Sequence, residues 1–158
     1  MNEKDEGVSA VSIDSDEYHY RIDKLKASIR EAGIDIALLT VGADVFYFSG
    51  TAVYSVLAVP VEGDPLLLVR INYERATKEC RLNKTNIRRS QGITSIQEYL
   101  LDLKAENAVI GIAKGVVTAS FLESLKRLLP RMDFRDISPI VLNIRMKKSP
   151  QEIAILKR

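Results

Sequence analysis

The sequence contains too few reactive side chains for several common kinds of active site. His19 is the only histidine and Cys80 the only cysteine among 158 residues, and tryptophan is absent. One histidine excludes a histidine-rich metal site, and one cysteine excludes an internal disulfide. His19 precedes the first amphipathic segment, which favours a solvated surface position. Cys80 falls on the apolar side of a predicted helix, which favours a buried structural thiol over a nucleophile.

The net charge is small, and the sequence has no long apolar run. The formal net charge of +2 gives no reason to expect nucleic acid or an anionic membrane as a partner. No apolar run approaches the ~20 residues that a membrane span requires, and residues 1–17 lack the apolar core of a signal peptide. We therefore expect a cytoplasmic protein, and the single cysteine fits a reducing compartment.

The length and the 46% apolar content fit one globular domain. Residues 1–17 are polar and acidic, which predicts a mobile N-terminal tail. Residues 18–145 carry the periodic apolar patterns of an α/β domain. Residues 146–158 are predicted to be a linker followed by the start of a further helix.

The apolar patterns within residues 18–145 alternate between helix and strand. Glu62–Pro65 is a turn sequence between two β-rich runs, so an antiparallel hairpin is predicted there. Because the hairpin lies in an otherwise crossover-connected chain, we predict an α/β fold with a mixed sheet and helices on both faces. The expected helices cover residues 18–32, 73–82, 95–103 and 118–129, and the expected strands cover 34–40, 55–61, 66–70, 87–91, 108–113 and 134–137, with a further extended run at 140–144 after Pro139.

Particular residues predict the ends and the orientation of several elements. Gly33 is placed to end the first helix in a left-handed conformation, and Ser95 and Thr118 are placed to cap two later ones. The aromatic run at residues 46–48 predicts a short helical connection directed into the core. Phe46 and Phe48 are interpreted as core residues, whereas the orientation of Tyr47 stays open because its hydroxyl needs a partner.

The last residues have the pattern of a helix start. Ser149 and Glu152 form the two halves of a capping box, and Pro150 suits the first helical position. Since the apolar stripe has only begun at Ile153, we expect the chain to be one part of a longer protein. The basic residues just before this helix, Arg145, Lys147 and Lys148, are then candidates for contact with whatever follows.

Residues 111–115, GIAKG, follow a predicted strand and are faintly similar to a phosphate-binding loop. They lack the Gly-Lys-Ser/Thr ending and the glycine density of a dinucleotide fingerprint. An ordinary strand-to-helix turn is therefore the better interpretation, and a free-standing nucleotide-binding domain is disfavoured.

Two segments together resemble the creatinase/prolidase N-terminal domain. Residues 32–40, AGIDIALLT, and residues 44–50, DVFYFSG, resemble its opening, in which a helix ends in Gly-Ile-Asp and a strand and a short turn follow. Residues 144–153, IRMKKSPQEI, resemble the segment that leads into the family's catalytic domain. The resemblance covers residues 18–158 and implies a ribonuclease H-like α/β fold.

The resemblance also implies a function for the parent protein. Members are Xaa-Pro dipeptidases and aminopeptidases whose C-terminal domain binds two divalent metal ions, such as Mn, Co or Zn, and hydrolyses proline-containing peptides. Their N-terminal domain is noncatalytic, contributes to a homodimer and covers the active site. For this chain the resemblance therefore implies no catalytic residue and no metal ligand of its own.

Three residues are candidates for contacts with the substrate, by position only: Tyr54, Arg70 and Tyr73. Family members often have Asp-x-Arg-Tyr after the hairpin, whereas residues 70–73 read RINY and retain only the tyrosine. Ordinary surface or sheet-edge roles stay open for all three. The alternative function is a protein-binding module, because the same architecture occurs in proteins whose peptidase half has lost its metals, including histone chaperones.

Overall fold

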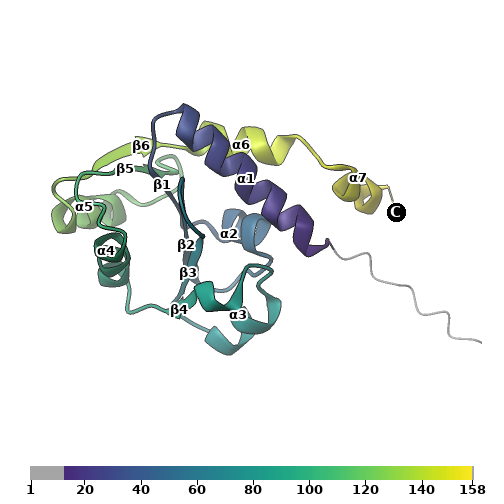
Figure 1. Ribbon diagram of the computed structural model, residues 1–158, viewed down its shortest axis with the longest axis horizontal. Coiled ribbons are helices and arrows are strands. Elements are labelled where there is room, and N and C mark those ends of the chain that lie inside the picture. Colours follow the sequence, from purple (N-terminus) through teal and green to yellow (C-terminus); the bar gives the residue numbers. More distant parts are fainter. Residues whose placement is uncertain (1–12, 158) are drawn as a thin grey trace, which may run out of the picture.

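A computed structural model describes residues 13–157 as one mixed sheet with helices on both faces (Figure 1). Within these residues the helices are α1 (Ser15–Glu31), α2 (Gly42–Ser49), α3 (Tyr73–Glu79), α4 (Ile93–Asp102), α5 (Ala119–Leu128), α6 (Ser138–Met146) and α7 (Pro150–Leu156), with one 3₁₀ turn, Lys84–Asn86. The strands are β1 (Ile36–Leu39), β2 (Ser55–Pro60), β3 (Leu66–Val69), β4 (Ile87–Arg89), β5 (Val109–Ile112) and β6 (Asp133–Asp136).

The six strands lie in the order β4-β3-β2-β1-β5-β6. β2 is antiparallel to both of its neighbours, and the other three pairs are parallel. Five strands therefore run in one direction, and their carboxyl ends meet at one edge of the sheet. The predicted hairpin is confirmed: Ser55 lies opposite Val69, and Gly63 in the turn adopts φ +89°, which favours glycine.

The core is divided between the two faces of the sheet. α1, α2, α3 and α6 cover one face, and α4 and α5 cover the other (Figure 1). Along β1, Ala37 and Leu39 pack on the first face and Ile36 and Leu38 on the second, and all four are buried. A strand covered on both sides is apolar without alternation, which is the pattern seen in residues 34–40. The predicted α/β fold is confirmed.

The first helix begins earlier than expected. Asp14 caps it by accepting a hydrogen bond from the Glu17 N–H at 3.0 Å, and this bond is the main reason that the pKa of Asp14 lies below its usual value. Helix α1 therefore includes residues 15–17, which were expected to belong to a mobile tail. The earlier part of that expected tail, residues 1–12, lies outside the described residues. At the other end Gly33 has φ +67°, as predicted.

The prediction of an extended run over residues 140–144 was wrong, because these residues belong to helix α6. Pro139 lies in the first turn, where its missing N–H costs no intrahelical hydrogen bond. Asp136 accepts hydrogen bonds from the Ser138 N–H at 2.9 Å and from its hydroxyl at 2.6 Å, which orders the entry to the helix. Val141 and Ile144, three positions apart, face the core.

Two local predictions also differ from the structure. Phe46 is half exposed, although Phe48 is fully buried as expected. Consecutive residues of a helix are rotated by about 100°, so residues 46–48 cannot all face the core. Helix α4 begins at Ile93 rather than at Ser95, whose hydroxyl instead accepts a hydrogen bond from the Gln91 N–H at 2.9 Å.

The predicted capping box of the last helix is confirmed. The Ser149 hydroxyl accepts a hydrogen bond from the Glu152 N–H at 3.2 Å, and the Glu152 carboxylate accepts one from the Ser149 N–H at 2.8 Å. α7 lies beyond the sheet, near the amino end of α1 (Figure 1). Within residues 13–157, no helix combines the length and apolar character that crossing a membrane requires.

Candidate functional site

A cleft of about 410 Å³ lies where the carboxyl ends of the parallel strands meet. β1, β3 and β4 lead into it, β2 starts from it, and the loop after β5 closes one side. Helices α4 and α5 begin at the same edge. In α/β sheets this edge is where ligands commonly bind, because chain reversals leave a crevice there. The lining residues are Thr40, Val41, Tyr54, Ser55, Val56, Leu68, Arg70, Ser90, Gly92, Ile93, Ile96, Val116, Val117, Thr118 and Phe121.

Most of the wall is aliphatic or aromatic, and the polar groups in it are mainly hydroxyls. Thr118 caps α5 by accepting a hydrogen bond from the Phe121 N–H at 3.2 Å, so its hydroxyl hydrogen remains available to a ligand. Ser90 is used within the chain, since its oxygen accepts a hydrogen bond from the Gly92 N–H at 3.0 Å. An apolar cleft with a few polar groups is the usual form of a small-molecule site.

Arg70 is the only charged residue among those that line the cleft. A Cβ at Gly92 would lie 2.8 Å from Arg70 Nη1, so the guanidinium lies directly over the start of α4. Gly92 has φ +111° and also lets the chain turn here. Within residues 13–157, neither a hydrogen bond nor an ion pair holds the Arg70 side chain.

Tyr54 lies at the rim of the same cleft, and the residue is 70% exposed. Its carbonyl accepts a hydrogen bond from the Arg70 N–H at 2.9 Å, so the backbones of the two residues are adjacent. The structure thus brings together two of the three residues that were chosen by position.

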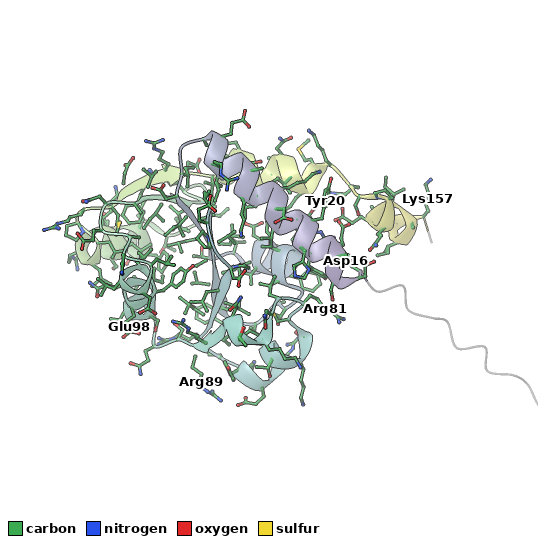
Figure 2. The ribbon with its side chains drawn as sticks, in the orientation of Figure 1. Asp16, Tyr20, Arg81, Arg89, Glu98 and Lys157 are labelled. Atoms are coloured by element: carbon green, nitrogen blue, oxygen red, sulfur yellow. The ribbon has the colours of Figure 1, made fainter. Side chains whose placement is uncertain are left out.

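Tyr73, the third candidate, does not line the cleft. Its hydroxyl donates a hydrogen bond to the Ile87 carbonyl at 3.1 Å, and the Arg89 guanidinium lies over its ring, 4.3 Å from the centroid. Arg89 also pairs with Glu74 at 2.7 Å and points outward from the edge strand β4 (Figure 2). These contacts give Tyr73 a packing role that joins α3 to β4.

A second polar cluster, which we call the α7 junction, joins α1, α2 and α7. Its centre is Arg21, which is only 2% exposed and lies between the rings of Tyr18 and Tyr47. Its guanidinium donates to Glu17 at 3.2 Å and to the Tyr47 carbonyl at 2.7 Å, and Nη2 lies 3.2 Å from a carboxylate oxygen of Glu152 in an ion pair. The last helix is therefore tied to the first by a buried charge.

The burial of Arg21 was not predicted. The sequence held one indication, because Arg21 lies beside Ile22 and three residues after Tyr18, within the apolar stripe of α1, and it is spaced i+4 from Glu17. Tyr47 belongs to the same cluster: burial raises its pKa, and the negative charge of Glu152 adds to the effect.

Two of the three basic residues before α7 have partners within the described chain. Arg145 pairs with the buried Asp44 at 2.7 Å, and the Lys148 ammonium donates to the Arg145 carbonyl at the end of α6. Lys147 is exposed. That these three residues contact a following segment stays a prediction.

The remaining reactive residues have structural surroundings. Cys80 is buried, and burial raises the pKa of its thiol, which disfavours the thiolate. His19 Nδ1 lies 2.7 Å from the Ser15 carbonyl on the outside of α1. Lys114, in the glycine-containing loop after β5, donates to the Phe134 carbonyl at 2.5 Å. No group of three or more His, Cys, Asp or Glu side chains within residues 13–157 is arranged to hold a metal ion.

Comparison with known proteins finds one family over most of the chain. The Creatinase/Prolidase N-terminal domain matches residues 21–147. An Xaa-Pro dipeptidase from Pyrococcus furiosus is 26% identical over 140 residues, which are 87% of this chain but only 38% of that protein. The chain thus spans well under half of the curated relative that it matches.

Solved structures share the fold. The Xaa-Pro dipeptidase from Bacillus anthracis superposes with a TM-score of 0.76 at 24% identity, covering 89% of this chain and 39% of the other. The N-terminal domain of the cytoplasmic peptidase PepQ from Mycobacterium tuberculosis superposes with a TM-score of 0.69 at 23% identity, covering 80% of this chain and 98% of the other. The described fold therefore corresponds to the N-terminal part of such peptidases.

Proposed function

Because the chain belongs to the creatinase/prolidase N-terminal domain family, we propose that it is the noncatalytic part of an Xaa-Pro dipeptidase-like metallopeptidase. The main support is coverage: the chain matches 38% of the Pyrococcus furiosus dipeptidase and 98% of a separately solved N-terminal domain. In this proposal the two divalent metal ions and the hydrolysis of proline-containing peptides belong to a catalytic domain of the parent protein.

The proposed role of this domain is dimerisation and covering of the active site. The edge that carries Tyr54 and Arg70 would face the bound peptide, where a rigid sheet edge admits short peptides and excludes folded chains. The exposed guanidinium of Arg70 and the ring of Tyr54 would then contribute to selection of the substrate. We also propose a cytoplasmic location, because the similar PepQ is described as a cytoplasmic peptidase.

The surface near the C-terminal helices supports docking of a further domain. Leu142 and Met146 on α6 and Leu156 on α7 are each more than half exposed. Leu142 and Met146 lie one helical turn apart on α6, and adjacent exposed apolar side chains commonly mark an interaction surface. In the proposed parent protein, the catalytic domain would cover them.

Two measurements on the purified chain test this proposal. With Mn²⁺ or Co²⁺ added, it should not hydrolyse Xaa-Pro dipeptides, and hydrolysis that a chelator abolishes would overturn the noncatalytic assignment. Sedimentation equilibrium should give twice the chain mass, because the domain is proposed to contribute dimer contacts. A monomer at all concentrations would remove dimerisation from its role.

A further inference from the structure

We propose that the cleft itself binds a small organic carboxylate with an apolar body, with the carboxylate against Arg70 and the apolar part against Ile93 and Phe121. The proposed function places Arg70 near the substrate of a catalytic domain, and this proposal goes beyond it by giving the cleft a ligand of its own. Binding would be a property of the isolated chain. The proposal depends on the charge, the polar groups and the size of the cleft.

The charge in the cleft is unbalanced. Arg70 is the only charged residue in the lining, and its Nη1 lies within 2.8 Å of the position that a Gly92 Cβ would take, over the amino end of α4. A helix amino end carries a partial positive charge, so the guanidinium and the helix repel each other. An anion bound beside both groups would interact favourably with each of them.

Five of the other exposed arginines already contact a carboxylate within the described chain at 2.6–3.1 Å: Arg30, Arg75, Arg88, Arg89 and Arg135. Three more, Arg81, Arg127 and Arg131, make no such contact within residues 13–157 but do not line the cleft. Arg70 has no such partner within residues 13–157, although it stands at the mouth of a cleft. Its planar guanidinium can bind a carboxylate through two parallel hydrogen bonds.

The remaining lining restricts the ligand to a molecule with one anionic group. The cleft has no acidic side chain to bind a cation, and a polyphosphate would meet only one guanidinium. Val41, Val56 and Ile93 offer an apolar surface, and the Thr118 hydroxyl can donate one further hydrogen bond. A volume of about 410 Å³ lies within the usual range of small-molecule pockets, roughly 300–1,000 Å³.

Titration of the ¹⁵N-labelled chain, followed by amide NMR, tests the proposal with four probes. N-acetyl-leucine represents a peptide C-terminus, 4-methylpentanoate is a carboxylate without a peptide group, N-acetyl-leucine amide lacks the charge, and inorganic phosphate lacks the apolar part. We expect the amide signals of Gly92, Ile93 and Thr118 to shift with one or both carboxylates at millimolar concentrations. The amide and the phosphate should bind at least tenfold more weakly.

The two carboxylates distinguish the source of the ligand. Tighter binding of N-acetyl-leucine would identify a peptide C-terminus, and equal binding would identify apolar carboxylates in general. Either result supports the proposal. Equal binding of the uncharged amide, or shifts confined to other parts of the chain, would overturn it.

Substitutions locate the contact. Arg70→Gln should weaken carboxylate binding at least tenfold, whereas Arg127→Gln should leave it unchanged, because Arg127 is also exposed but lies on the last turn of α5, outside the cleft. Phe121→Ala provides an independent test of the apolar wall and should also weaken binding. Circular dichroism would verify that each variant is folded. Equal binding to wild type and to Arg70→Gln would overturn the proposal.

The sedimentation measurement keeps this proposal separate from the proposed function. A dimer that binds no carboxylate would overturn only the ligand site. A monomer that binds the carboxylate through Arg70 would support the ligand site and overturn only the role in dimerisation.

Discussion

The α7 junction and the cleft use the same side chain in opposite ways. Arg21 at the junction is buried and surrounded by two carboxylates, a carbonyl and two aromatic rings. Arg70 in the cleft is exposed, and its side chain makes neither a hydrogen bond nor an ion pair within residues 13–157. An arginine whose charge is neutralised within the chain stabilises the fold, whereas one whose charge is not neutralised is available to a ligand. Whether an arginine stabilises the fold or can bind a ligand therefore depends on the groups around it, not on the residue type.

The largest expected effect is the loss of the buried charge. Arg21→Met should lower the free energy of unfolding by about 3 kcal/mol, because Glu17 and Glu152 would remain in a largely buried site without their counter-ion. Arg70→Gln should change it by less than about 0.5 kcal/mol, as expected for an exposed side chain without partners. Urea unfolding of both variants measures the difference.

Arg30→Met is the matched control for this prediction. Arg30 also lies on α1 and also pairs with a glutamate, at 2.8 Å, but both side chains are more than half exposed. Exposed ion pairs contribute about 0–1 kcal/mol, so this variant should remain close to wild type. Equal losses from Arg21→Met and Arg30→Met would show that burial of the ion pairs at the junction adds nothing to the free energy of unfolding.

A second comparison concerns a buried tyrosine, Tyr99, whose hydroxyl differs from the ion-paired Arg21 at the α7 junction. Tyr99 on α4 is buried on the face that carries the cleft, and its hydroxyl has no hydrogen-bond partner within residues 13–157. Burial raises the pKa of Tyr99 from 10.0 to about 12. At a pH between these two pKa values, the Tyr99 phenol has lost its proton in the unfolded chain but still keeps it in the folded chain. Stability should therefore fall by roughly 2–3 kcal/mol from pH 10 to pH 12, with no contribution below pH 10.

Tyr99→Phe isolates this contribution from the other groups that titrate at high pH. The variant should lack this part of the alkaline decline, and at pH 7 it should be as stable as wild type or more stable by up to about 1 kcal/mol, because an unpaired hydroxyl is removed. Denaturant unfolding at several pH values gives both results. The same alkaline decline in the two proteins would mean that the Tyr99 hydroxyl is hydrated in the folded state.

Backbone geometry gives a third contrast. Gly92→Ala should cost about 2 kcal/mol, because φ +111° disfavours a side chain and the new Cβ would lie against the Arg70 guanidinium. Gly42→Ala is the matched change at the start of α2, where a Cβ would meet open space, and it should raise stability by up to about 1 kcal/mol. Thermal unfolding of both variants tests this difference. A neutral Gly92→Ala would show that the cleft backbone can relax.

Most of the fold could be predicted from the sequence because its indications are local. The hairpin turn, Gly33, Thr118 and the Ser149 capping box depend on residues within a few positions of one another, and the structure places them as expected. Helix α6 was missed because Pro139 was interpreted as an interruption, although proline is equally suited to a first helical turn.

The candidate site was less predictable because it is assembled from distant segments. Tyr54 and Arg70 are sixteen positions apart, and their common cleft depends on the antiparallel pairing of β2 with β3 and on walls supplied by α4 and by the loop before α5. The burial of Arg21 depends on contacts with Tyr47 and Glu152, far away in the sequence. A pattern within one helix does not contain such partners.

The smallest expected effect concerns the end of the chain and tests whether the junction or the cap orders α7. Ser149→Ala removes the side-chain acceptor of the Glu152 N–H and should cost about 1 kcal/mol. Because α7 is only seven residues long, hydrogen exchange should accelerate in α7 and not in the sheet. Glu152→Gln should have the larger effect, since it weakens both the cap and the ion pair to Arg21. If Ser149→Ala accelerates exchange more than Glu152→Gln, the buried arginine contributes less to holding α7 than its own first turn does.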